Sequence, residues 1–220
     1  AFRFSSKLGF EIENNTLDAI KKNAELIKFV SIERIVNEIK KLLAGKGNLK
    51  SLELLIDSKL NSYIPFFEEV NEIQDLSSYS FCQSLYILSI INDISFEKLK
   101  FLKLSNKEIK LVKQFDLINQ EFKNNTQIEL ILYKYNREDI KFICEYFGYD
   151  KEKNIDERIL TINSFNDIDI TSQEIISTIN KNPGPWIKSI TLELEKEILL
   201  GRLNNNKKDI LDFLSKLRDN

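Results

Sequence analysis

The chain has 220 residues and a formal net charge of −2, with 42% hydrophobic and 30% charged residues. These values are typical of a globular protein and exclude an intrinsically disordered chain. The chain contains no histidine, which excludes histidine general acid–base catalysis, histidine metal ligands and nucleophiles activated by histidine. Because only six Gly and three Pro interrupt the chain, long helices form easily, and we predict an all-α protein.

The first part of the chain, residues 1–46, is predicted to contain three helices. Residues 1–8 have the pattern of a helix end, and Gly9 can adopt the left-handed conformation that terminates a helix. A second helix is expected to begin at a Thr16 cap. The third begins after Ser31, whose hydroxyl can accept a free backbone N–H. Its apolar side chains recur at helical spacing, at Ile32, Ile35, Ile39, Leu42 and Leu43.

The polar side of the third helix carries a candidate motif of Ser31, Glu33, Arg34 and Glu38. Glu33 suits the first turn, where the helix dipole favours negative charge. Arg34 and Glu38 are four residues apart, so we predict that they can pair. A cation near a helix N-terminus is disfavoured by the dipole, and we expect a carboxylate or a phosphate to compensate the charge of Arg34.

A segment with two glycines, 45–48, marks a boundary, and a second domain of helices is predicted over residues 47–148. The stretch Phe81 to Ile91 is apolar on nearly all sides and should form the central buried helix. Ser105 and Glu108 form a capping box that opens a further helix. Two more helices are expected over 129–135 and 138–147.

The last part, residues 149–220, is predicted to be a third helical domain, with a polar boundary over 150–156. Thr171 and Glu174 form another capping box. Trp186 follows a Pro-Gly-Pro segment and opens a long helix, and a final helix is expected over 207–217. We interpret Trp186 as a core anchor in preference to a base-stacking residue.

Charge is distributed unevenly along the chain. Residues 1–50 carry a net charge of +4 and residues 181–220 a net charge of +2, whereas residues 51–180 carry −8. We expect the basic ends to face phosphate and the acidic middle to face away from nucleic acid. The alternative, that these imbalances are ordinary solvated surface charge, stays open.

Three motifs occur in order along the chain. The first motif consists of Arg3, Phe4, Leu8, Gly9 and Phe10. The second consists of Ser31, Glu33, Arg34, Ile35, Glu38, Lys41, Leu42 and Leu43. The third consists of Gly184, Pro185, Trp186 and Ile187, followed by Gly201, Leu203 and Asn205. Together these motifs resemble the neck and tail of the bacterial class II tRNA nucleotidyltransferases, the family of CCA-adding enzymes and poly(A) polymerases. The chain departs from the family at residues 172–174, where many members have Gly-Lys-Asp.

The resemblance implies an elongated helical array of neck (1–46), body (47–148) and tail (149–220), without the α/β nucleotidyltransferase head. The absence of Met indicates a fragment of a longer protein, whose head would precede Ala1. The catalytic carboxylates, Mg²⁺, CTP and ATP are expected in that head, so no catalytic residue, metal or cofactor is expected on this chain.

The partners that the resemblance implies are the acceptor and T arms of tRNA, and the missing head. The candidate tRNA-binding residues are Arg3, Lys7, Arg34, Lys181, Gly184 and Lys188. Arg3 and Arg34 would contact either phosphate or carboxylates of the neck. CCA addition is favoured over poly(A) addition, because the strongly basic C-terminal extension of poly(A) polymerases is missing. A helical scaffold that binds protein instead of RNA is the remaining alternative.

Other features predict a cytoplasmic protein without a membrane partner. No apolar run is long enough to span a bilayer and no signal peptide is visible. Cys82 and Cys144 lie among apolar residues and are expected to be buried free thiols in a reducing compartment. Asp167 and Asp169 have the spacing of a metal-binding carboxylate pair, but we interpret them as surface loop acids.

Overall fold

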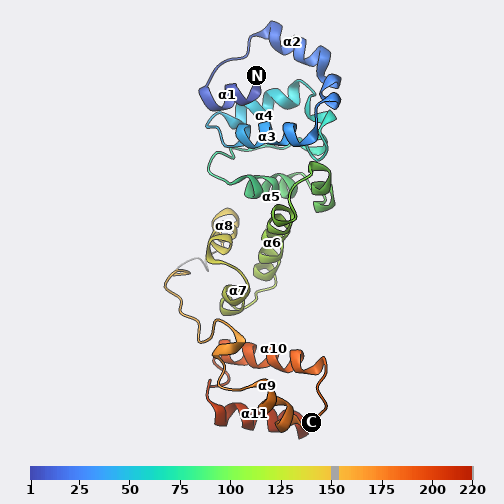
Figure 1. The fold of residues 1–220 in the computed structure, drawn as a ribbon. Helices are drawn as coiled ribbons and strands as arrows, with labels where there is room; N and C mark the ends of the chain where they lie inside the picture. The colour runs from blue at the N-terminus through green and yellow to red at the C-terminus, as the bar shows by residue number, and fades with distance from the viewer. Residues whose placement is uncertain (150–153, 220) are drawn as a thin grey trace. The chain divides into compact units, whose positions relative to one another are not determined.

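The computed structural model describes residues 1–149 and 154–219 (Figure 1), and within these ranges it contains helices and no strand. The predicted all-α class is therefore confirmed. The α-helices are α1 Phe2–Leu8, α2 Asn14–Asn23, α3 Ile32–Leu43, α4 Asn48–Asp57, α5 Phe81–Ile91, α6 Asn106–Lys123, α7 Ile128–Lys134, α8 Arg137–Phe147, α9 Ser172–Ile179, α10 Trp186–Leu199 and α11 Lys207–Asp219. Short 3₁₀ helices include η1 Ala24–Phe29, η2 Asn61–Tyr63, η3 Phe67–Glu69, η4 Phe96–Leu102 and η6 Phe165–Asp167. None of the helices described is both long and apolar enough to cross a lipid bilayer.

The chain divides into two compact units, unit 1 (Ala1–Asp116) and unit 2 (Leu117–Asn220). The division lies within α6. In unit 1, α1 packs against both α3 and α4 (Figure 1), so segments on either side of residue 46 share one packed unit. The three-part division into 1–46, 47–148 and 149–220 stays a prediction, and residues 150–153 of its second boundary lie outside the described residues.

Helix α5 forms the centre of unit 1, as its uniformly apolar sequence predicts. Ser80 caps it through a capping box with Gln83. Four consecutive side chains, Leu85 to Leu88, have no exposed surface. The ring of Tyr86 lies 5.8 Å from that of Phe115 on α6. A helix that is apolar on all sides is stable only when it is surrounded, and α5 satisfies this condition.

A notch of two glycines fixes α1 in unit 1. The Ser6 hydroxyl donates to the Leu42 carbonyl over 2.5 Å, and the Gly47 N–H donates to the Ser6 carbonyl over 2.9 Å. A Cβ on Gly45 would lie 2.1 Å from the Ser6 hydroxyl oxygen and 2.7 Å from the Ser6 backbone. The close approach aligns α1 beside α3, and it therefore determines where the side chains of α1 lie.

Several predicted helix ends are confirmed, and the predicted start of the second helix is wrong. The capping boxes at Ser105 and Thr171 are present, and Gly9 ends α1 in the left-handed conformation with φ of 72°. The second helix, α2, begins at Asn14 and not after Thr16. Its first turn starts earlier because the Glu13 carbonyl already accepts the N–H of Leu17.

Unit 2 contains a hydrophobic cluster that joins α9, α10 and α11. Its buried members include Ile175, Leu194 and Leu214. Trp186 packs against this cluster and its Nε1 donates to the Asn182 carbonyl over 2.8 Å. The interpretation of Trp186 as a core anchor is therefore confirmed. The Tyr133 hydroxyl on α7 also donates to Glu195 on α10 over 2.6 Å.

Candidate functional site

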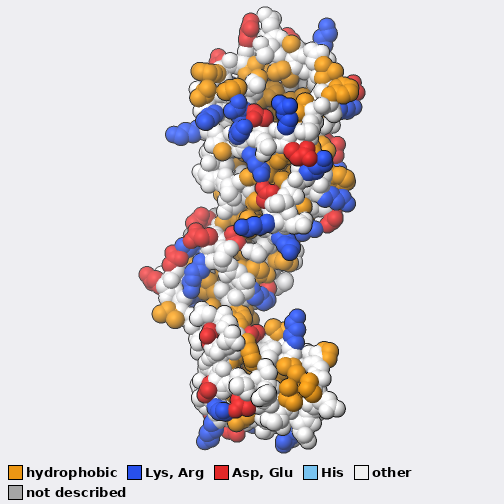
Figure 2. All heavy atoms as spheres, viewed as in Figure 1, with side chains coloured by type: hydrophobic (Ala, Val, Ile, Leu, Met, Phe, Trp, Pro, Cys, Tyr) orange, Lys and Arg blue, Asp and Glu red, His pale blue; other side chains and the backbone are white. Residues whose placement is uncertain are grey.

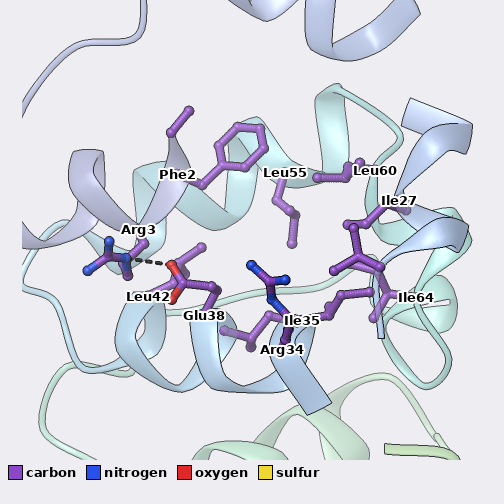
Figure 3. A pocket seen from close by; sticks show the side chains of 13 residues that line it. Phe2, Arg3, Ile27, Arg34, Ile35, Glu38, Leu42, Leu55, Leu60 and Ile64 are labelled. Carbon is purple, nitrogen blue, oxygen red and sulfur yellow. Dashed lines mark ion pairs between the residues drawn. The ribbon is translucent and has the colours of Figure 1, made fainter. Parts of the chain in front are cut away.

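Unit 1 contains a cavity of about 270 Å³ in which the N-terminal motifs meet (Figure 3). Most of the lining is apolar, and the lining also includes one anionic and two cationic side chains. The apolar residues are Ala1, Phe2, Ile27, Val30, Ile35, Ile39, Leu42, Leu55, Leu60 and Ile64, and the charged residues are Arg3, Arg34 and Glu38. An apolar cavity with a few charged groups is typical of a binding site.

Arg3 on α1 forms an ion pair with Glu38 on α3. The Nε–Oε2 distance is 2.6 Å, but Arg3 Nε forms no hydrogen bond of acceptable geometry. The contact is therefore an ion pair without an aligned hydrogen bond. Glu38 also accepts a hydrogen bond from Lys41 over 2.9 Å. That hydrogen bond, followed by the charge of Arg3, lowers the pKa of the Glu38 carboxyl below its usual value.

The predicted pair between Arg34 and Glu38 is wrong. Packing of α1 against α3 brings Arg3 to one Glu38 oxygen, and Lys41 binds the other oxygen. Arg34 forms no ion pair within the described part of the chain. Figure 3 shows its guanidinium extending from α3 into the space between the labelled side chains. Arg34 is exposed and its charge is available to a ligand or to another protein segment.

The predicted hydroxyl cap of α3 is also wrong. Ser31 occupies the N-cap position, but its side chain accepts no helical N–H. Instead, Glu33 has a lowered pKa, caused first by a hydrogen bond from its own backbone N–H and then by a hydrogen bond from Lys103. The Ser31 side chain makes a smaller contribution through its own hydrogen bond to Glu33. A carboxylate in the first turn thus replaces the hydroxyl as the acceptor of a free N–H.

The remaining predicted tRNA-binding residues do not join this cavity. Lys7 lies on α1, exposed and outside the lining. Lys181, Gly184 and Lys188 lie in unit 2, at or just before the start of α10. The structure therefore brings Arg3 and Arg34 together within unit 1, and it leaves the tRNA contacts of all six residues as predictions.

Sequence reasoning missed an apolar surface at the start of the chain. Half of the large hydrophobic side chains that are exposed in the described residues lie within the first thirty: Phe4, Leu8, Phe10, Leu26, Phe29 and Val30. Phe29 is the extreme among these six, with 86% of its surface exposed. Figure 2 shows hydrophobic side chains gathered on the part of unit 1 that carries α1 and α2. Exposed apolar side chains that gather on one part of a molecule are typical of an interaction site. The sequence contained one signal, namely Leu26 and Phe29 of η1, which lie off the apolar face expected for the second helix.

No described group of three or more Cys, Asp or Glu side chains is arranged to hold a metal ion. Asp167 accepts backbone N–H groups from Asn163 and Ser164, and Asp169 accepts one from Lys207. These two acids hold loops together, as expected for surface loop acids.

Comparison with known proteins agrees with the arrangement of helices and motifs. The structure superposes on the crystal structure of the Bacillus stearothermophilus CCA-adding enzyme in complex with CTP, with a TM-score of 0.86 and 22% sequence identity, over 99% of this chain and 60% of that chain. At this identity the likeness shows a shared fold. The chain thus has the helical fold that is present in a nucleotide-adding enzyme.

Sequence relatives identify the family. A CCA-adding enzyme of Staphylococcus aureus (strain bovine RF122 / ET3-1) is 30% identical over 96% of this chain and 58% of its own length. A CCA-adding enzyme of Staphylococcus epidermidis is 26% identical over the same shares. Residues 9–71 match the family described as a probable RNA and SrmB-binding site of polymerase A, and residues 80–214 match the putative domain 2 of tRNA nucleotidyltransferase. The chain belongs to the tRNA nucleotidyltransferase family, and it spans less than two thirds of the length of these relatives.

Proposed function

We propose that this chain is the part of a CCA-adding tRNA nucleotidyltransferase that binds tRNA and positions its 3′ end. The main support is the alignment with CCA-adding enzymes along 96% of the chain. The match of residues 9–71 to a probable RNA-binding site supports an RNA ligand. The specific contacts proposed are the acceptor and T arms, through Lys7, Lys181, Gly184 and Lys188.

The cavity around Arg34 fits a second role, which is to dock the nucleotidyltransferase head. The cavity walls are apolar, and the exposed residues Phe4, Phe29 and Val30 belong to the apolar surface at the start of the chain. An apolar surface of this kind matches a protein surface better than it matches phosphate. Arg34 would then pair with a carboxylate of the head, because a guanidinium forms paired hydrogen bonds with carboxylates.

Catalysis belongs, in this proposal, to the head that precedes these residues. The head would hold Mg²⁺ between acidic side chains and the triphosphate of CTP or ATP. The present chain would contribute the position of the tRNA and the support beneath the nucleotide site. Arg3 and Glu38 hold α1 beside α3, so they would act by positioning and would not touch the nucleotide.

Two assays test the proposal. Titration of a tRNA that lacks its 3′ CCA should show binding to the 220-residue chain, and that binding should weaken steeply with salt. The chain alone should transfer no labelled CTP or ATP to the same tRNA with Mg²⁺ present, whereas the protein that includes the head should add C, C and A. Tight binding that salt does not affect would contradict the proposal and support a protein-binding scaffold.

Poly(A) addition is the second candidate function. It is supported by the match of residues 9–71 to a family that is described as a binding site of polymerase A. The protein with its head, supplied with ATP alone and a tRNA that already ends in CCA, distinguishes the two. A growing A tail supports poly(A) addition. No extension of this tRNA, together with full addition of CCA to a shortened tRNA, supports the first candidate.

A further inference from the structure

A lysine-rich stretch lies in the part of unit 1 that the charge distribution assigned to the acidic middle of the chain. Residues 96–116, which comprise η4 and the first half of α6, contain six lysines and three acids. The surrounding residues 51–180 are strongly acidic. A local excess of positive charge in this setting is a candidate for an interaction with an anion.

Ion pairs neutralise only half of these six lysines, and most of the acidic partners lie outside residues 96–116. The ion pairs are Lys98 with Glu68 and Glu69, Lys103 with Glu33, and Lys113 with Glu97. The carboxylate of Glu108 forms an ion pair with Lys40 and accepts the Ser105 N–H in the capping box of α6, so it pairs with none of these six lysines. Three exposed lysines form no ion pair within the described ranges, and these are Lys100, Lys107 and Lys110.

An exposed aromatic ring lies among these three lysines in the sequence. Phe101 is 52% exposed, whereas its neighbours Leu99 and Leu102 are fully buried in the core. The Lys100 ammonium lies 5.2 Å from the centroid of the Phe101 ring, which is within the range of a cation–π contact. An exposed ring beside a cation is a combination with which proteins bind unpaired nucleic-acid bases.

Lys107 and Lys110 are three residues apart in the first turns of α6 and therefore lie on neighbouring positions of its surface. Both are exposed. The dipole of an 18-residue helix disfavours cations at this end. A bound phosphate would offset this cost, because the same helix end and both ammonium groups attract an anion.

We propose that the exposed residues Lys100 and Phe101 of η4 and Lys107 and Lys110 of α6, here called the η4–α6 surface, bind RNA. The lysines contact backbone phosphates, and Phe101 stacks on an unpaired base. The inference rests on the proposed function, because it takes tRNA as the RNA. The charge distribution predicted that residues 51–180 face away from nucleic acid, whereas this proposal places one part of that range in contact with RNA.

The first test compares two double variants of the 220-residue chain with a tRNA that lacks its 3′ CCA. The variant K107Q/K110Q removes two charges from the η4–α6 surface. The control K59Q/K123Q removes two exposed charges from other parts of the acidic middle, and these lysines likewise form no ion pair with a described residue. We expect the first variant to bind roughly tenfold more weakly at about 0.1 M salt, with a salt slope smaller by about 1 to 2. The control should retain wild-type binding.

The second test replaces Phe101 by Leu, which keeps an apolar side chain and removes the ring, and by Tyr, which keeps the ring. We expect F101L to bind a single-stranded tRNA end at least about fivefold more weakly, the lower limit for base–aromatic stacking, and F101Y to bind like the wild type. Melting temperatures of all variants show whether the fold is retained.

The outcomes separate this inference from the proposed function. If the wild-type chain binds tRNA and K107Q/K110Q has the same affinity and salt slope, the η4–α6 surface does not contact phosphate and the inference fails alone. If F101L binds like F101Y, the stacking contact is absent. If the wild-type chain shows no salt-dependent binding to tRNA, the proposed function fails and the inference fails with it.

Discussion

The substitution Gly45→Ala tests how the glycine notch positions the candidate site. An added Cβ would lie 2.1 Å from the Ser6 hydroxyl oxygen and 2.7 Å from the Ser6 carbonyl carbon and oxygen. Real Cβ atoms do not approach other atoms so closely, so α1 must move away from the end of α3. Movement of α1 carries Arg3 away from Glu38, and the substitution therefore affects the cavity as well as the core.

The magnitude follows from the atoms that clash. Overpacking in a core costs typically 1–3 kcal/mol, and a clash with backbone lies at the upper end because backbone moves less easily than a side chain. We expect Gly45→Ala to cost about 3 kcal/mol and to lower the melting temperature by about 6 °C or more. A Cβ on Gly47 would lie 3.2 Å from the Ser6 carbonyl oxygen. We therefore expect Gly47→Ala to cost under about 1 kcal/mol.

The assay is thermal unfolding followed by far-UV circular dichroism, with Gly47→Ala as the matched control. The combination of Gly45→Ala with Ser6→Ala removes the contact with the hydroxyl, but Ser6→Ala by itself also removes the hydrogen bond to the Leu42 carbonyl. Gly45→Ala should therefore cost less in the Ser6→Ala background than in the wild type. Equal melting temperatures for Gly45→Ala and the wild type would refute the notch. A Gly47→Ala variant that loses as much as Gly45→Ala would also refute it, because the cost would not follow the distances.

Three further predictions concern single side chains. Arg34→Ala should change the melting temperature by less than about 1 °C, because the guanidinium has no ion pair within the described residues. The same substitution should reduce nucleotide addition by the protein that includes the head. A variant that loses stability and keeps full activity would contradict this prediction. Glu174 has a pKa of about 2, lowered first by its hydrogen bond with Lys207. The stabilising effect of its carboxylate should therefore be complete above pH 4.5 and be lost as the pH falls through about 2. Unfolding followed by the fluorescence of Trp186, the only tryptophan, should show that Glu174→Gln is less stable than the wild type at neutral pH and lacks this acid transition. Asn48 is fully buried, and its side chain forms hydrogen bonds with the Gly45 carbonyl, the Asp75 carboxylate and the Leu76 N–H. Asn48→Ala should therefore destabilise unit 1 by about 2–4 kcal/mol, measured by denaturant titration. A cost below about 1 kcal/mol would show that residues 75–76 do not depend on the Asn48 side chain.

The sequence was sufficient to predict elements that depend on neighbouring residues. The buried helix α5 has the predicted bounds, Phe81–Ile91, because a run that is apolar on every side can only be stable at the centre of a core. The capping boxes at Ser105 and Thr171 form as predicted, since both partners lie within one helical turn. The motifs around Arg3 and Arg34 also sufficed to indicate the family.

The partners of charged side chains in the site were decided by tertiary structure. Spacing along α3 predicted that Glu38 would pair with Arg34, yet Glu38 pairs with Arg3. The sequence separation between these partners is large, and only the packing of α1 against α3 brings them together. That packing depends on the missing side chain of Gly45, which has no local signature. The cavity likewise combines residues from several segments. Its apolar walls, and the guanidinium of Arg34 that is unpaired among the described residues, therefore follow from long-range packing, which periodicity and capping do not encode.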